Sequence, residues 1–150
     1  METILAATDF SPVTKAVVAR AIALTRGRRA QIAMLHVVNP PGLAGSPDGL
    51  FTELVPLIGA MREAGARKLK KWEEFLEHRE IPATTIQVEG FPAREITQQA
   101  RKLRAKYIVM GSHGHSGLYD LLVGSTTSGV IKRAKCPVVV VQARQKRSRA

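Results

Sequence analysis

Hydrophobic positions along this chain fall into five short apolar runs separated by stretches with helical spacing. The runs predict β-strands at residues 4–7, 31–38, 82–89, 106–110 and 137–142. The intervening stretches predict four helices. The first covers 12–26; the second follows a loop at 39–49 and is clearest over 66–78; the third lies around 96–103, and the fourth runs from 125 or 126 to 134. Apolar strands that alternate with helices indicate a parallel sheet covered on both faces, and hence one doubly wound α/β domain.

Individual residues refine the predicted elements. Ser11 is suited to cap the first helix, Pro12 to occupy its first position and Gly27 to end it. Trp72 falls on the apolar face of the long helix, which predicts a place in the core. The run Val138–Val141 is read first as a buried strand. If it lies unpaired at a sheet edge, it would invite pairing with a second copy of the chain.

Length and composition limit the class of protein. The chain has 150 residues, enough for one hydrophobic core, and no apolar run approaches the roughly 20 residues of a membrane span. The N-terminus enters a strand directly and lacks the pattern of a signal peptide. The lone cysteine, Cys136, cannot form an internal disulfide and is read as structural. These features favour a reduced, cytoplasmic location.

The charge is strongly basic. Lys and Arg number 23 against 12 Asp and Glu, so the formal net charge is +11. Four basic residues lie in 144–150, a segment without apolar periodicity that we expect to be a disordered tail after a domain at 1–143. Removing the four leaves 11 − 4 = +7. A basic surface attracts polyanions, but the sequence contains no zinc spacing or RNP-type stretch typical of a nucleic-acid module.

Two segments at predicted strand ends carry candidate chemistry. Thr8-Asp9 follows the first strand, and Gly111-Ser112-His113-Gly114 follows the fourth. Ligands of doubly wound sheets bind at the carboxyl ends of strands. Glycines there permit positive φ and let backbone N–H groups approach a phosphate. Gly124 then precedes Ser125, Thr126 and Thr127 at a predicted helix start, which offers unpaired N–H donors and hydroxyls.

Other interpretations of these residues remain open. The segment is neither a Walker A loop nor a dinucleotide fingerprint, since Gly111, Gly114 and Gly117 read G-x-x-G-x-x-G. A purely structural turn is the alternative. Asp9 could equally bond within its own turn or cap the first helix. His113 and His115 form an H-x-H without further ligands nearby in sequence, so we expect no metal site, and His113 is placed beside the phosphates.

The wider pattern resembles the universal stress protein family over essentially the whole chain. The resemblance is carried by Gly111-x2-Gly114-x9-Gly124-Ser125, with Val109-Met110 before it and Thr126-Thr127 after it. The first-strand segment 4–11, the pair His36-Val37 and the segment 134–140 also match. The resemblance implies a five-stranded parallel sheet in the order 3-2-1-4-5, similar to adenine nucleotide alpha hydrolases. It also implies a homodimer formed through the last strand, Val138–Val141.

Relatives with this glycine spacing commonly bind ATP, and the resemblance implies the same here, with Mg²⁺ as an accompanying ion. Asp9 and the backbone around Val37 would hold the adenosine end, and the glycines, Ser125 and a neighbouring threonine would hold the phosphates. The implied binding residues are Thr8, Asp9, Val37, Met110, Gly111, His113, Gly114, Gly124, Ser125, Thr126 and Thr127.

Three functions compete on the sequence. The first is an ATP-binding stress-response switch, the second an enzyme that hydrolyses ATP, and the third an adaptor that binds no nucleotide and uses its basic surface. Hydrolysis needs a positioned base and a cation for the phosphates. Asp9 is the acid we can place near the site, and no lysine lies in the phosphate loop. The intact glycine spacing argues against the adaptor. The sequence therefore favours ATP binding with at most slow hydrolysis and assigns no catalytic residue.

Overall fold

A computed structural model describes residues 1–40, 50–113 and 123–142 of the chain. Its elements follow the order predicted from the hydrophobic pattern. They are β1 (Glu2–Thr8), α1 (Thr14–Thr25), β2 (Ala30–Val38), α2 (Leu50–Glu77), β3 (Ala83–Glu89), α3 (Pro92–Lys102), β4 (Tyr107–Gly111), α4 (Ser125–Arg133) and β5 (Val138–Val141). Gly114, Gly117, His115, most of the loop 39–49 and the tail 144–150 lie outside the described residues.

The five strands form one parallel sheet in the order β3-β2-β1-β4-β5. This order confirms the doubly wound fold. From β1 the chain adds β2 and then β3 on one side of β1. It then returns through α3 and adds β4 and β5 on the other side, so the winding reverses between β1 and β4. No helix in the described ranges is long and apolar enough to span a membrane.

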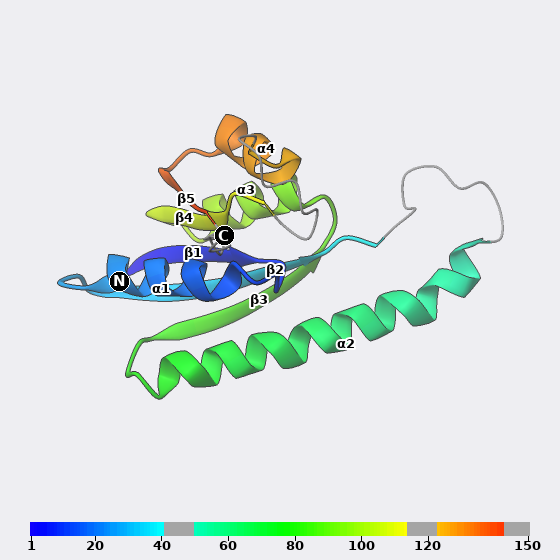
Figure 1. Cartoon of the computed structure of the whole chain (residues 1–150), viewed down its shortest axis with the longest axis horizontal. Helices are drawn as coiled ribbons and strands as arrows, with labels where there is room; N and C mark the ends of the chain where they lie inside the picture. The colour runs from blue at the N-terminus through cyan, green and yellow to red at the C-terminus, as the bar shows by residue number, and fades with distance from the viewer. Residues whose placement is uncertain (41–49, 114–122, 143–150) are drawn as a thin grey trace, which may run out of the picture.

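Helices cover both faces of the sheet (Figure 1). On one face α1 and α2 pack on alternate strand residues such as Ile4, Ile32 and Met34. On the other face α3 and α4 pack on the intervening residues, including Leu5 and Leu35. The alternation follows from the two-residue period of a strand, and it explains why the central strands are apolar at every position.

Three residue-level predictions need correction. Ser11 does not cap a helix and Pro12 is not in one, because α1 begins at Thr14 and its N-cap, Val13, makes no side-chain hydrogen bond. Ser11 belongs instead to a tight turn, in which its carbonyl accepts from the Thr14 amide at 3.0 Å. β5 is an edge strand whose four valines are half-buried, since one side has no neighbour. Gly27, at φ +69°, ends α1 as predicted.

Trp72 and Cys136 lie at the edges of the two cores. Trp72 is half-buried and packs against the α1–α2 core beside Phe75, with ring centroids 5.2 Å apart. Cys136 packs against the α3–α4 core, where burial raises the pKa of its thiol. A raised pKa keeps the thiol protonated, which agrees with a structural role for this cysteine.

Candidate functional site

A cavity of about 520 Å³ opens at the carboxyl ends of β1, β2 and β4, where the winding of the sheet reverses. Its volume is in the range of small-molecule sites. Every predicted binding residue in the described part of the chain lines it: Thr8, Asp9, Val37, Met110, Gly111, His113, Gly124, Ser125, Thr126 and Thr127. Segments more than 100 residues apart in sequence therefore meet in one place, which is what the sheet order requires.

The turn after β1 fixes the first wall of the cavity. The Asp9 carboxylate accepts from the Ser11 amide at 2.9 Å, so its bond within its own turn is confirmed. The Thr8 hydroxyl accepts from the Phe10 amide at 2.9 Å and lies 2.8 Å from the Thr14 hydroxyl. Thr8 is thus held by the protein itself. The Asp9 side chain remains part of the cavity lining.

The end of β4 and the start of α4 form the opposite wall. The Gly124 amide donates to the Ser112 carbonyl at 2.9 Å. The Thr127 hydroxyl, which is buried, donates to the Gly111 carbonyl at 2.8 Å. These bonds fasten the first turn of α4 to the strand. Because the Thr127 hydroxyl donates its proton to the Gly111 carbonyl, Thr127 positions the start of the helix rather than donating to a ligand.

The first turn of α4 presents to the cavity amides that have no partner among the described residues. The first intrahelical bond runs from the Ser128 amide to the Gly124 carbonyl, so the amides of residues 125–127 precede the helical ladder. No acidic side chain occupies this first turn, and Gly124 offers no capping side chain. The first turn itself therefore supplies no negative charge to offset the positive end of the helix dipole, as at anion-binding helix starts.

The two described glycines of the motif are needed for packing rather than for a left-handed backbone. A Cβ at Gly111 would lie 2.6 Å from Cγ1 of Val13. A Cβ at Gly124, whose φ is −58°, would lie 3.2 Å from the Ser112 carbonyl oxygen. Neither residue has a positive φ. The positive φ that glycine permits is therefore not used at these two positions, and the approach of their amides to a phosphate stays a prediction.

His36 is a lining residue that was not among the predicted binding residues. Its Nδ1 donates to the Thr8 carbonyl at 3.0 Å, and its ring packs against Phe10 with centroids 4.5 Å apart. Burial lowers the pKa of His36, against opposing contributions from the Thr8 bond and Asp9, and Lys68 lowers it further. The neutral ring is therefore favoured near pH 7. Gly65 of α2 makes room for it, because a Cβ there would lie 2.9 Å from the imidazole.

An apolar part of the lining was also missed by sequence reasoning. It comes from five elements or turns: Val13, Val17, Leu35, Val38, Met61, Pro92 and Ile96. These positions read as ordinary core in the hydrophobic pattern. Most of them lie near strand ends or helix starts, a signal that needs the sheet order to interpret, whereas Met61 lies within α2 and carries no such signal.

The charges of the site are few. Among the described lining residues Asp9 is the acid, His36 and His113 are the imidazoles, and there is no Lys or Arg. No group of three His, Cys, Asp or Glu in the described ranges could hold a metal ion. The cavity can therefore attract an anion through amides and the dipole of α4, and it can hold an apolar ring against aliphatic side chains.

A parallel sheet in this order, with a cavity at its switch point and a helix start facing that cavity, defines a doubly wound α/β domain. Residues 1–142 match the model of the universal stress protein family. The chain belongs to this family.

Curated relatives and solved structures agree. The universal stress protein MJ0531 of Methanocaldococcus jannaschii is 36% identical over 135 residues, covering 90% of this chain and 78% of the relative. YxiE of Bacillus subtilis is 29% identical over 146 residues, covering 92% and 97%. The structure of MJ0577, also from M. jannaschii, superposes with a TM-score of 0.86 at 28% identity, covering 97% of this chain and 98% of that one. UspA of Lactobacillus plantarum gives 0.83 at 25% identity, covering 93% and 97%.

Proposed function

We propose that the protein binds ATP in the switch-point cavity and acts as a stress-response regulatory switch. The observation that supports this most directly is the start of α4, where Gly124, Ser125, Thr126 and Thr127 all line the cavity and the first-turn amides precede the helical ladder. Such a helix start favours phosphate groups. The aliphatic lining then suits the adenine ring, with Asp9 and Val37 at the adenosine end.

One structural neighbour holds a nucleotide. It is a universal stress protein described as a complex with cAMP, and it superposes with a TM-score of 0.65 at 19% identity. At that identity the likeness concerns the fold, so the adenine nucleotide is proposed for this chain on the cavity itself. Mg²⁺ would accompany ATP as a counter-ion of its phosphates, since the described lining offers it one carboxylate, that of Asp9.

Hydrolysis is proposed to be slow at most. Phosphoryl transfer needs a cation on the transferred phosphate and a group that orients water. The described lining provides no Lys or Arg, and its one acid already accepts a bond from the Ser11 amide. A weak ATPase is the alternative. A cytoplasmic location is part of the same proposal.

The test is a pair of substitutions at Ser125, an exposed residue in the first turn of α4. Ser125→Glu places a negative charge where the phosphates are proposed to bind, while an acid at a helix start also stabilises the helix. Ser125→Gln has similar size without the charge. We expect S125E to weaken ATP binding about a hundredfold in calorimetry, because like charges across a binding site cost several kcal/mol.

S125Q should retain most of the affinity and serves as the matched control. Thermal unfolding of both variants checks that the fold persists. Equal affinity of S125E and the wild type would refute a phosphate site at α4. Nucleotide released when the purified protein is denatured would distinguish ATP from ADP or AMP. A protein that binds none of them would instead support the adaptor that uses its basic surface.

We also propose a homodimer formed through β5. The Pro137 and Val141 carbonyls accept from the Ile108 and Ser112 amides of the β4 side. By the two-residue alternation, the amides of Val138 and Val140 face the open edge of the sheet. Val140→Pro removes one outward donor and leaves the β4 ladder intact. In sedimentation at micromolar concentration the wild type should be a dimer and V140P a monomer, whereas a monomeric wild type would exclude this dimer.

A further inference from the structure

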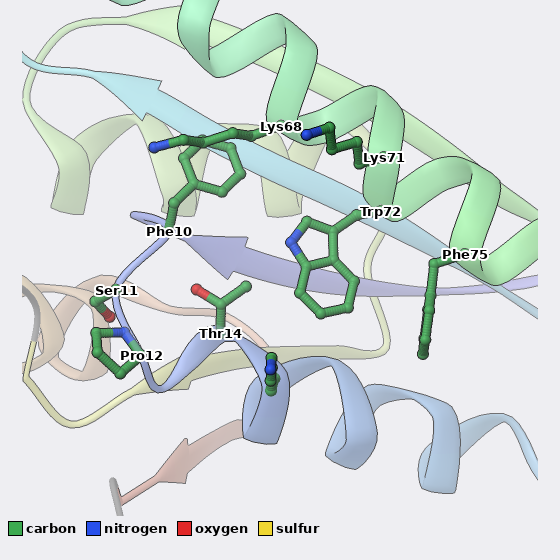
Figure 2. A pocket seen from close by; sticks show the side chains of 9 residues that line it. Phe10, Ser11, Pro12, Thr14, Lys68, Lys71, Trp72 and Phe75 are labelled. Atoms are coloured by element: carbon green, nitrogen blue, oxygen red, sulfur yellow. The ribbon is translucent and has the colours of Figure 1, made fainter.

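A second hollow of about 530 Å³ lies between the start of α1 and α2, apart from the switch-point cavity (Figure 2). We call it the α1–α2 groove. It is lined by two segments far apart in sequence: Phe10, Ser11, Pro12, Thr14 and Lys15 on one side, and Lys68, Lys71, Trp72 and Phe75 on the other. Nothing in the sequence motif of the first site accounts for it.

Aromatic rings form the inner surface of the groove. Trp72 and Phe75 both project from α2 toward α1, and their rings meet edge to face at 78° (Figure 2). Phe10 reaches in from the turn after β1. All three rings are half-buried, so each keeps surface that a ligand could cover. Half-exposed aromatic rings at a hollow offer a planar ligand both apolar area and stacking geometry.

Three lysines at the rim have no carboxylate partner in the part of the chain that the structure describes. Other basic residues of α2 are ion-paired: Arg62 with Glu89, Arg67 with Glu63 and Lys70 with Glu73. Lys15, Lys68 and Lys71 have no ion pair among the described residues, and the lining contains no acid. The Lys68 ammonium lies over the Phe10 ring, 5.3 Å from its centroid. The groove therefore combines an apolar floor with uncompensated positive charge.

A buried hydroxyl gives an independent indication of a ligand. Ser11 lines the groove and is 4% exposed, yet its Oγ has no hydrogen-bond partner within the described ranges. Buried hydroxyls are ordinarily hydrogen-bonded, since leaving one unpaired costs free energy. The neighbouring Thr14 hydroxyl is not in the same condition, because it pairs with Thr8 at 2.8 Å.

We propose that the α1–α2 groove is a second ligand site, for a small organic anion in which a planar aromatic ring carries a phosphate or carboxylate. The ring would pack against Trp72 and Phe75, and the anionic group would lie near the lysine ammonium groups. A nucleic-acid strand fits less well. It needs positive charge along several successive phosphates, and the basic residues beside the groove on α2 are already ion-paired.

The experiment uses 1-naphthyl phosphate as the probe, on the full chain, by calorimetry. Inorganic phosphate supplies the charge alone, 2-naphthol the ring alone, and octyl phosphate a chain in place of the ring. Because Trp72 is the single tryptophan of the sequence, its indole N–H gives one NMR signal that reports on the groove. We expect 1-naphthyl phosphate to bind tightest and to shift that signal. Comparing the affinities of naphthoate and naphthyl phosphate then shows whether the site prefers a carboxylate or a phosphate.

Matched variants locate the binding. Lys68 and Lys71 are exposed, so the double change Lys68→Gln with Lys71→Gln should keep the fold and weaken probe binding about tenfold, as expected for two exposed charge pairs. Lys70→Gln lies on the same helix outside the groove and should change nothing. S125E should also leave probe binding unchanged, which separates this site from the proposed ATP site.

Three results would overturn the proposal. Unchanged probe affinity in the double lysine variant would show that the rim charges are not used. Loss of probe binding in S125E would place the probe in the switch-point cavity. Tighter, lysine-dependent binding of an oligothymidylate would replace the small anion with single-stranded nucleic acid. Failure of ATP to bind the wild type would leave the groove proposal untouched, since the one lining residue that the two sites share, Thr14, has its hydroxyl paired with Thr8.

Discussion

The switch-point cavity and the α1–α2 groove have nearly the same volume, about 520 and 530 Å³, but they are built from different parts of the polypeptide. The cavity is made from strand ends and a helix start, and its described lining includes no Lys or Arg. The groove is made from aromatic side chains and three lysines. Both arrangements can attract an anion. The first does so with backbone amides that the fold fixes in place, and the second with flexible ammonium groups.

The two sites are expected to differ in how far a substitution can change ligand affinity without changing the stability of the fold. The backbone groups at the end of β4 and the start of α4 hold the sheet and the helix together, so changes there should affect folding as well as the proposed binding. Exposed lysines contribute little to folding, and surface substitutions usually change the free energy of unfolding by less than about 0.5 kcal/mol. The lysines of the groove can therefore be altered without cost to the fold, while the glycines of the cavity cannot. The predictions below test that contrast.

The largest expected effect on stability is at Gly111. Its missing side chain lets Val13 pack against β4, because a Cβ would lie 2.6 Å from Val13 Cγ1. Gly111→Ala should lower the free energy of unfolding by about 1–3 kcal/mol, as for other overpacked cores. Equilibrium unfolding in urea measures it. The double lysine variant of the groove should unfold at the same urea concentration as the wild type.

A second background identifies the cause. Val13→Ala removes the methyl group that the new Cβ would meet, so Gly111→Ala should cost clearly less in that background than in the wild type. Equal costs in both backgrounds would mean that Val13 is not what requires glycine at this position. In that case the contrast between a rigid cavity and a tolerant groove would lose its structural basis.

The same contrast explains what could be predicted from the sequence. The strands, the helices and the doubly wound arrangement followed from periodicity, because burial on both faces makes the central strands apolar throughout. The candidate segments followed from their place at predicted strand ends and a helix start. The sheet order and the full set of binding residues came through the family resemblance, and the described binding residues meet at one cavity. A site built from backbone at strand ends leaves a local motif of glycines.

The groove left no such motif. Its two halves, residues 10–15 and 68–75, are more than 50 positions apart and come together only through packing of α1 beside α2. Trp72 lay on an apolar face and was assigned to the core, since periodicity does not distinguish full from half burial. Serine is a residue type that often caps helices, but the Ser11 amide donates to the Asp9 carboxylate, which places Ser11 in a turn. The hydrophobic pattern does not show whether a polar side chain will form a turn or cap a helix.

The smallest predicted effect concerns His36, which lies between the two sites. Its ring lines the cavity and packs against Phe10 of the groove. Burial lowers the pKa of His36 in the folded protein, with Lys68 also lowering it and Asp9 and the Thr8 carbonyl opposing. The unfolded chain, with a pKa near 6.5, therefore binds the proton more readily. Stability must rise with pH between the folded and unfolded pKa values.

Urea unfolding at pH 7.5, 6.5 and 5.5 measures this dependence above the range where most carboxylates titrate. The wild type should lose stability as pH falls below about 6.5, and the loss should level off below the folded pKa of His36. His36→Gln keeps a donor for the Thr8 carbonyl and removes the titration, so its loss over the same range should be smaller. The other three histidines of the sequence are present in both proteins, so their contribution cancels in the comparison. Parallel curves for the two proteins would show that the imidazole between the sites is not the group that burial holds neutral.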